Sequence, residues 1–363
     1  MWNIPNRNFG LDVIRATAIT LVVISHCTYI LPEFNSTLTN AIRLLGATGV
    51  DIFFVLSGYL IGGILLRKLE TNKTNFKDLF HFWKRRWFRT LPNYFAVLFL
   101  NITLVLFLGD NLVDDVWLYI PFLQNFYHPH PDFFTEAWSL SIEEYAYLIL
   151  PLAMYLGLSF FKKIKSSIIF IQTTILIILV LFVFKLKFYL EITITDYSHW
   201  SATFRKVVIY RLDAIYYGFI MVFLMSKYTF FRGNSRLFLW SGFLLFIVLH
   251  LLILVFDISP DNFLGFFSLF YLPLVSISIA LVFPFFISLK KNRLIGLITY
   301  VSKRSYSIYL VNYSLILLSL KRFFQPSFFI VIVFLILTLI ISEILYRTIE
   351  IPFLRLRKRL VPR

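Results

Sequence analysis

The chain has 363 residues, of which 59% are hydrophobic, 19% aromatic and only 15% charged, and its net charge is +16. Soluble domains carry about a quarter of their residues as charged side chains, so this composition excludes an ordinary soluble protein and indicates an integral membrane protein. The single cysteine, Cys27, excludes an internal disulfide framework and a cysteine-rich metal site.

Long apolar segments recur along the whole chain and are continuous rather than alternating. Such segments favour α-helices over an outer-membrane β-barrel. The sequence therefore predicts an all-α integral membrane protein, a bundle of about ten transmembrane helices in one domain covering residues 1–363. The predicted spans are 11–31, 43–66, 92–109, 139–160, 166–184, 207–226, 237–256, 263–288, 304–320 and 327–346. The first is expected to be retained rather than cleaved as a signal peptide, because charges lie inside it.

The loops between these spans differ in charge. Residues 67–91 form a strongly basic predicted loop, whereas residues 110–136 contain no lysine or arginine. The positive-inside rule then predicts that both termini are cytoplasmic. Two loops, 185–206 and 321–326, do not fit, because each is basic on the predicted outer side. We attribute the net charge to loops that face anionic lipid, and we expect no nucleic-acid partner.

The first predicted span contains Asp12, Arg15 and His26. Arg15 and His26 are about three helical turns apart, so their side chains leave the helix on nearly the same face. Asp12 lies one turn before Arg15 on a similar face. Ionisable groups are costly in a membrane, which favours a functional role. The alternative is a pair of end charges that reach the interface, together with a histidine packed in the core.

Other predicted spans place ionisable residues at about the depth of His26. These residues are Asp51, Glu143, Glu144, Arg211 and Asp213. Gathered in one layer, they are expected to pair and to line a wet cavity. The alternative is an ion-pair network that only holds the helices together.

Three smaller patterns complete the inventory. Residues 82–92 combine three arginines with two tryptophans, which suits phosphate binding or, as the residues alone favour, anchoring in lipid headgroups. Gly58 and the Gly62–Gly63 pair predict close helix packing rather than phosphate binding. His128 and His130 lie in a proline-containing segment and predict a surface loop rather than a metal site.

In this order, the motifs resemble those of the acyltransferase-3 family of bacterial multi-span membrane O-acyltransferases. The resemblance covers about the whole chain. The matching positions are Asp12, Arg15 and His26 in the first helix; residues 49–61 (GVDIFFVLSGYLI); residues 84–92 (KRRWFRTLP); Trp138, Ser139, Leu140, Glu143 and Tyr147; Arg211, Asp213 and Gly218; residues 304–312 (RSYSIYLVN); and Glu350 with Pro352.

Two positions depart from the family pattern. Asn312 stands where many members have histidine, which puts an essential base at that position in doubt, and Tyr145 stands where glutamine is usual. Some members also carry an extracytoplasmic hydrolase-like domain. We expect this chain to be the form without one, so that any second transfer step would need a separate partner.

The resemblance implies a reaction. An acyl group, expected to be acetyl, would move from cytoplasmic acyl-CoA such as acetyl-CoA to a hydroxyl of a surface glycan, such as an O-antigen, capsule or exopolysaccharide. The expected location is the bacterial cytoplasmic (inner) membrane. Expected partners are acyl-CoA, a carbohydrate or lipid-linked glycan, membrane lipid and glycan-assembly proteins. We expect no permanently bound cofactor and no metal.

The resemblance also suggests roles for residues. His26 is the candidate general base, or a transient carrier of the acyl group, and Glu143 is expected to orient it. Arg15 and Asp12 are expected to guide the thioester. The donor is assigned to Arg85, Arg86, Arg89 and Ser57. The acceptor is assigned to Asp51, Trp138, Tyr147, Arg211 and Asp213, and for Arg211 and Asp213 structural pairing is the alternative. The alternative function is a transporter or flippase, which would also use charges inside the membrane but would need no CoA site.

Overall fold

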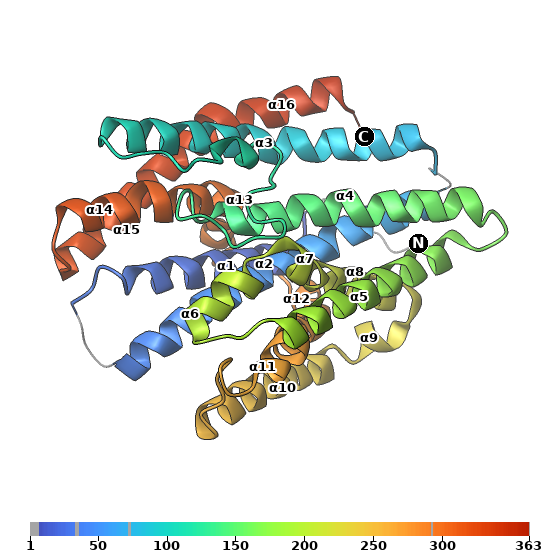
Figure 1. Ribbon diagram of the computed structural model, residues 1–363. Helices are drawn as coiled ribbons and strands as arrows, with labels where there is room; N and C mark the ends of the chain where they lie inside the picture. The colour runs from blue at the N-terminus through green and yellow to red at the C-terminus, as the bar shows by residue number, and fades with distance from the viewer. Residues whose placement is uncertain (1–6, 33–35, 72–73, 292, 363) are drawn as a thin grey trace.

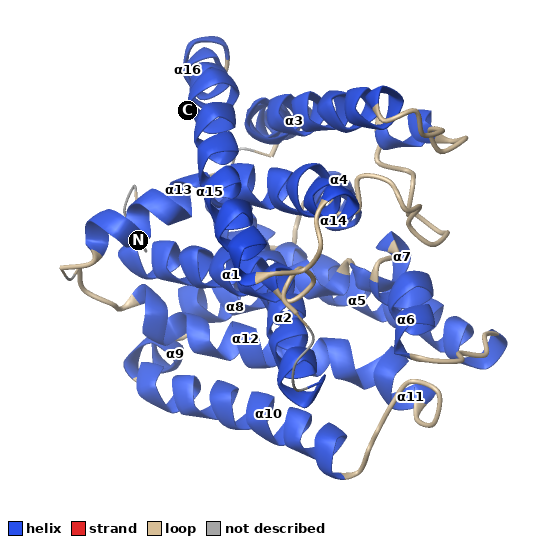
Figure 2. Cartoon of the chain, turned by 90° about the vertical axis from the view of Figure 1, so that its left-hand side faces the viewer, coloured by secondary structure: helices blue, strands red, loops and turns tan. Residues whose placement is uncertain are grey.

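The computed structural model describes residues 7–32, 36–71, 74–291 and 293–362, and within these ranges it contains helices and no β-strand (Figures 1 and 2). The predicted all-α fold is therefore confirmed. The long helices are α1 (Phe9–Cys27), α2 (Ser36–Glu70), α3 (Phe76–Phe107), α4 (Ala137–Phe160), α5 (Ser166–Glu191), α8 (Asp213–Lys227), α10 (Ser235–Val255), α12 (Leu272–Ile287), α13 (Ile295–Val311) and α15 (Phe328–Leu345).

Shorter helices connect or extend these elements. They are α6 (Tyr197–Trp200), α7 (Val208–Arg211), α9 (Thr229–Gly233), α11 (Leu264–Phe266), α14 (Leu318–Phe323), α16 (Ile351–Leu360), a 3₁₀ turn η1 (Val116–Tyr119), and the π-helical segments η2 (Ser201–Arg205), η3 (Phe267–Tyr271), η4 (Asn312–Leu317) and η5 (Tyr346–Glu350). In Figure 2, α3 and α16 lie on one side of the bundle and α10 on the opposite side.

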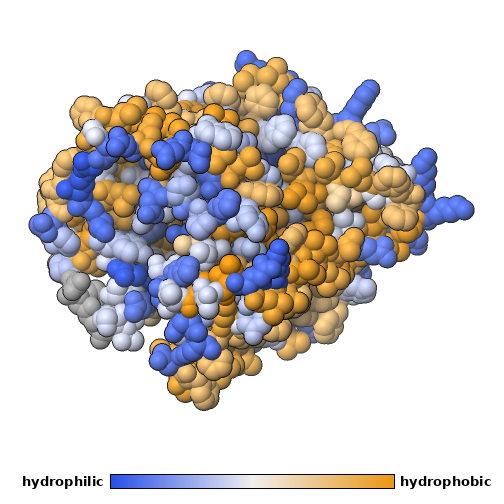
Figure 3. Space-filling view, in the orientation of Figure 1, coloured by the Kyte–Doolittle hydropathy of each residue, from blue (hydrophilic) through white to orange (hydrophobic). Residues whose placement is uncertain are grey.

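Eight helices in the described part of the chain are long and apolar enough to cross a membrane. Two further predicted spans, 139–160 and 304–320, are helical as α4 and as the run α13–η4–α14, although they are not among those eight. The most apolar helices bury little of their surface; within its most apolar 18-residue stretch, α10 is only 11% buried. Large apolar side chains facing outward suit contact with lipid, and Figure 3 shows broad apolar areas on the surface. The count of ten and the orientation of the termini stay predictions.

The prediction of a long basic loop at residues 67–91 is wrong. α2 continues to Glu70, and α3 begins at Phe76 after a cap in which Asn75 and Asp78 bond each other's backbone. All of KRRWFRTLP lies inside α3, which continues through Pro92. Clustered charge suggested a loop, but an amphipathic helix can hold the same charges on one face.

Two glycines allow a very close contact between α2 and α8 in the core. A Cβ atom on Gly58 of α2 would lie 1.8 Å from the carbonyl oxygen of Ile215, and one on Gly218 of α8 would lie 2.2 Å from the carbonyl oxygen of Val55. No larger residue fits at either position without moving a backbone. The predicted packing role of Gly58 is confirmed, and the contact fixes α8 against α2.

Candidate functional site

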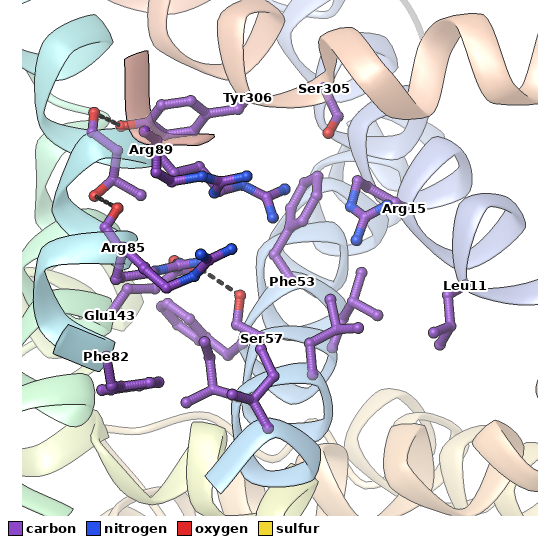
Figure 4. A pocket seen from close by; sticks show the side chains of 18 of the residues that line it. Leu11, Arg15, Phe53, Ser57, Phe82, Arg85, Arg89, Glu143, Ser305 and Tyr306 are labelled. Carbon is purple, nitrogen blue, oxygen red and sulfur yellow. Dashed lines mark hydrogen bonds and ion pairs between the residues drawn. The ribbon is translucent and has the colours of Figure 1, made fainter. Parts of the chain in front are cut away.

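A pocket of about 1100 Å³ opens between α1, α2, α3, α4 and α13 (Figure 4). Its lining is unusually rich in cations. They are Arg7, Arg15, Arg67, Lys68, Lys77, Arg85, Arg86, Arg89 and Arg357. Figure 4 shows Arg85 and Arg89 extending from α3, and Arg15 from α1, into the space between these helices. The structure thus brings together seven predicted site residues in one pocket: Asp12, Arg15, Ser57, Arg85, Arg86, Arg89 and Glu143.

The arginines of α3 differ in how strongly they are held. Arg86 Nη2 donates to Glu143 Oε2 at 3.1 Å, and Arg85 Nη1 donates to the carbonyl oxygen of Val361 at 2.5 Å. Arg89 is exposed in the pocket and forms no hydrogen bond or ion pair with the described residues. Its guanidinium is therefore available to a bound anion.

Arg15 and Asp12 form one unit. Arg15 Nη1 lies 3.3 Å from Asp12 Oδ1 and donates to Ser302 Oγ at 3.0 Å, while Ser302 donates to the same carboxylate oxygen at 2.7 Å. Arg7 also pairs with Asp12, at 2.7 Å. One buried carboxylate thus holds two guanidiniums at the α1 side of the pocket, and the pocket keeps a net positive charge.

Glu143 does not orient His26, and that prediction is corrected. Its carboxylate accepts hydrogen bonds from Ser57 Oγ and Tyr147 Oη, each at 3.0 Å, in addition to the one from Arg86. The Arg86 guanidinium also lies over the Tyr147 ring, 4.2 Å from its centre. Glu143 faces α2 and α3, so it positions Arg86 instead.

His26 has Asn312 as its partner. His26 Nδ1 forms a short hydrogen bond with Asn312 Oδ1. The amide of Asn312 can point only one way, because its Nδ2 donates to the carbonyl oxygens of Ile308 and Tyr309 at 2.7 and 2.8 Å. Oδ1 is therefore an acceptor, and Nδ1 of His26 must carry the proton. Nε2 of the neutral ring is left as a proton acceptor, which is the form a general base requires.

The sequence departure at 312 thus has a structural meaning. Asparagine cannot act as a base, but it fixes the tautomer of one, as the third member of a catalytic triad does. Asn312 opens the π-helical segment η4, a distortion often found at functional sites. Sequence reasoning marked this position but did not link it to His26, since the two residues are 286 positions apart.

The inner end of the pocket reaches toward the pair formed by His26 and Asn312. Tyr309 and Ser139 line the pocket, and their hydroxyls hydrogen-bond each other at 2.7 Å. Tyr309 also offers its carbonyl oxygen to Asn312. One helical turn of α13 therefore separates the pocket lining from the partner of His26, while His26 itself does not line the pocket.

The remaining charged residues form ion pairs as predicted, but Asp51, Arg211 and Asp213 do not line the pocket described above. Asp51 pairs with Arg211 at 2.6 Å and lies 3.7 Å from Arg205, whose guanidinium faces the ring of Trp138 at 5.3 Å. A separate, fully buried ion pair joins Asp213 to Lys185. Each carboxylate is neutralised locally, because an unpaired charge in this apolar interior would be costly.

The residues that broke the positive-inside pattern are now explained. Lys185 and Arg205 belong to the predicted outer loop 185–206, yet they are only 1% and 7% exposed. Inside the bundle, Lys185 pairs with Asp213, and Arg205 pairs with Asp51. Arg322 of the other exceptional loop pairs with Asp110. In the sequence, only the excess positive charge of these two loops indicated that their basic residues form ion pairs.

Sequence reasoning also missed Glu136, which lies directly before α4. Its carboxylate accepts hydrogen bonds from the backbone and the hydroxyl of Ser314 in η4, two residues after Asn312. Burial raises the pKa of Glu136 to about 7, although the bonds from Ser314 oppose this shift. Glu136 thus ties the loop before α4 to the segment that holds His26. An acidic residue two positions before Trp138 was the only available sequence signal.

A family model described as an acyltransferase domain matches residues 8–347. The chain belongs to this acyltransferase family. It is 29% identical over 371 residues to O-acetyltransferase OatA of Staphylococcus aureus (strain NCTC 8325 / PS 47), covering 94% of this chain and 56% of that protein. It is also 29% identical to the putative O-acetyltransferase SACOL0978 of Staphylococcus aureus (strain COL), with 95% and 57% covered. No solved structure shows a significant match.

The chain spans a little over half the length of these relatives. The family match ends at residue 347, so α16 lies beyond it, yet Arg357 and Pro362 line the pocket. Among the described residues, no three His, Cys, Asp or Glu side chains are grouped to hold a metal ion.

Proposed function

We propose that this protein is a membrane O-acyltransferase that transfers an acyl group, first of all acetyl, from acyl-CoA to a hydroxyl of a glycan. The supporting observation is the layout of α1. Its first turns contribute Asp12 and Arg15 to a pocket lined with cations, and its last turn carries a histidine whose Nε2 has no hydrogen-bond partner among the described residues. A donor and an acceptor can therefore approach the same helix from opposite ends.

The pocket suits a donor that carries phosphates. Guanidinium groups bind phosphate oxygens through paired, charge-assisted hydrogen bonds. Arg85, Arg86 and Arg89 come from one face of α3, and Arg89 is unpaired among the described residues. Coenzyme A has several phosphates at one end and a thioester at the other, so the acyl group would point inward toward Tyr309.

His26 would act as the base. Nε2 accepts the proton of the acceptor hydroxyl while the hydroxyl oxygen attacks the thioester carbonyl carbon. The carbon–sulfur bond then breaks, and the proton passes from His26 to the sulfur of the leaving thiol. Asn312 keeps Nδ1 protonated and stabilises the imidazolium that forms between these steps.

The ion pairs around Asp51 and Asp213 are assigned to structural pairing. Arg211 is fully buried, and its partner Asp51 is 4% exposed. Groups this enclosed hold α2 against α7, and α5 against α8, rather than meet a glycan. The protein would reside in the bacterial cytoplasmic membrane and work beside glycan-assembly proteins.

The test is the O-acetyl content of surface polysaccharide, measured by NMR or mass spectrometry. Wild type is compared with a deletion strain and with the deletion complemented by wild-type or His26→Ala protein. We expect acetylation to be lost in the deletion and restored only by wild type, at equal protein levels. Unchanged acetylation in the deletion would contradict a glycan acceptor.

A second measurement separates this enzyme from a transporter. Membranes that contain the wild-type protein are incubated with radiolabelled acetyl-CoA and glycan fragments. The enzyme transfers label to the glycan, whereas a transporter or flippase leaves the thioester intact and transfers none.

A further inference from the structure

A group of aromatic and cationic side chains lies beside His26 at the end of α1. We call Tyr29, Arg43, Tyr313 and Lys321 the cation–aromatic cluster. The rings of His26 and Tyr313 are 4.8 Å apart, and Tyr29 stands edge-on to Tyr313 at 6.3 Å. Figure 1 places the end of α1, the beginning of α2 and α14 at the same end of the bundle, and Arg43 and Lys321 lie on α2 and α14.

Two cations share the ring of Tyr29. The Arg43 guanidinium carbon lies 4.3 Å from the ring centre, and Lys321 Nζ lies 5.8 Å from it. Arg43 is also held by a hydrogen bond from its Nε to Thr28 Oγ1 at 3.1 Å. These contacts hold the guanidinium in place and leave its two terminal nitrogens without a hydrogen-bond partner in the described part of the chain.

The local charge is not neutralised in the same way as elsewhere in the protein. Among the described residues, no carboxylate forms a salt bridge with Arg43 or Lys321, whereas the neighbouring Arg322 pairs with Asp110. Two carboxylates, Glu136 and Asp132, interact electrostatically with Tyr313 instead, and Glu136 is bound by Ser314. Neither Arg43 nor Lys321 is therefore held by a carboxylate in the described part of the chain, and both cations lie beside a neutral base.

The backbone at this place is also tied down. The amide of Ser327, after α14, donates to the carbonyl oxygen of Ile30 at 3.0 Å. The segment after α1 and the segment after α14 are thereby joined, so Tyr29 and Lys321 keep their relative position. A preorganised group of this kind is suited to binding a ligand.

We propose that the cation–aromatic cluster binds an anionic group, a phosphate or a carboxylate, carried by the glycan acceptor. The inference rests on the proposed function and adds the substrate class to it. The free nitrogens of Arg43 match the paired oxygens of such a group, and Lys321 adds a second charge. Tyr29 and Tyr313 pack against the sugar ring, which leaves a hydroxyl of that ring near His26 Nε2.

The anion also assists the reaction. His26 becomes positively charged when it takes the hydroxyl proton, and a nearby phosphate or carboxylate stabilises that charge. An anionic acceptor is therefore favoured in both binding and transfer, and a neutral glycan loses both contributions.

The experiment measures acceptor preference with the purified full chain in nanodiscs and acetyl-CoA as donor. The acceptors are a neutral oligosaccharide, the same oligosaccharide with one uronate, and the same oligosaccharide with one glycerol phosphate. We expect wild type to prefer either anionic acceptor by roughly 10- to 100-fold in kcat/KM, as expected for hydrogen bonds to a charged group. Arg43→Gln/Lys321→Gln should lower kcat/KM for both anionic acceptors to the value for the neutral acceptor.

Arg322→Gln is the matched control, because it removes one charge from the same segment at a residue that pairs with Asp110. It should keep the wild-type preference. Equal use of neutral and anionic acceptors by wild type, or an unchanged preference in the double variant, would overturn the inference and leave the O-acyltransferase proposal standing. No transfer to any acceptor by wild type would contradict both.

A lipid phosphate is the competing source of the anion. The assay is therefore repeated in nanodiscs of neutral lipid alone and in nanodiscs with anionic lipid. We expect the preference of wild type, and its loss in the double variant, in both. A difference between wild type and double variant that exists only with anionic lipid would assign the cluster to lipid headgroups and overturn the glycan assignment.

Discussion

The two ends of α1 use charge in opposite ways. At its beginning, Asp12 holds Arg7 and Arg15 at the wall of a wide pocket that keeps a large excess of positive charge. At its end, His26 is neutral, and a single hydrogen bond to Asn312 decides which nitrogen carries the proton. The first arrangement attracts and holds a charged molecule, and the second prepares one atom for chemistry. Variants at the two ends should therefore affect different kinetic constants.

Loss of His26 should have the largest effect. His26→Ala is expected to lower kcat for acyl transfer by roughly 10²- to 10⁴-fold, the usual contribution of a general base. Binding of acyl-CoA should not change, because His26 does not line the pocket. Transfer kinetics and equilibrium binding of a non-hydrolysable CoA thioether to the purified protein check both statements. A fall in donor affinity equal to the fall in kcat would show that the two ends are not separate.

Asn312→Ala tests the positioning of the base. Without the acceptor at Nδ1, the ring can rotate or carry its proton on Nε2, so we expect kcat to fall by about 10- to 100-fold with little change in the KM for donor. Asn312→Asp supplies an acceptor at the same place and should recover much of the rate, which a merely structural role would not predict. The pH profile of kcat should change in Asn312→Asp, because a carboxylate favours the protonated ring. Identical losses in both variants would refute the tautomer assignment.

Arg89→Gln tests the donor end. Because Arg89 forms no salt bridge with the described residues, its loss breaks none, although it removes one positive charge near the buried Glu350. We expect the KM for acyl-CoA to rise by about 10-fold or more, as for the loss of a hydrogen bond to a charged group, while kcat at saturating donor stays the same. Lys84→Gln is the control, since Lys84 lies on the same helix outside the pocket and faces Phe80. A raised KM in Lys84→Gln would point to a general surface-charge effect instead.

The smallest effect concerns Glu136 and pH. Its pKa is about 7 in the folded protein and near 4.5 in an unfolded chain, so the folded state holds the proton more tightly. The associated stability is present below about pH 4.5 and is lost as pH rises toward 7. The melting temperature of the detergent-solubilised protein should fall over this range, and Glu136→Gln should flatten that part of the profile. The same slope in the variant would assign the effect to another group.

The sequence also shows why some residues were found and others missed. The pocket residues Arg15, Arg85, Arg86, Arg89 and Glu143 were all identified from motifs, and the structure brings them together. Their roles were less predictable: Glu143 was assigned to His26 but contacts Arg86. A motif tells which side chains matter, whereas the partner of a side chain depends on how helices pack.

By itself, the sequence determined the all-α membrane fold and the close contact at Gly58, because apolar segment length and the absence of a side chain are local properties. Tertiary structure decided the pairings of His26 with Asn312, Asp51 with Arg211, and Asp213 with Lys185. These partners are 28 to 286 positions apart. A buried polar group must find its partner wherever packing places one, and neither spacing nor composition records that place.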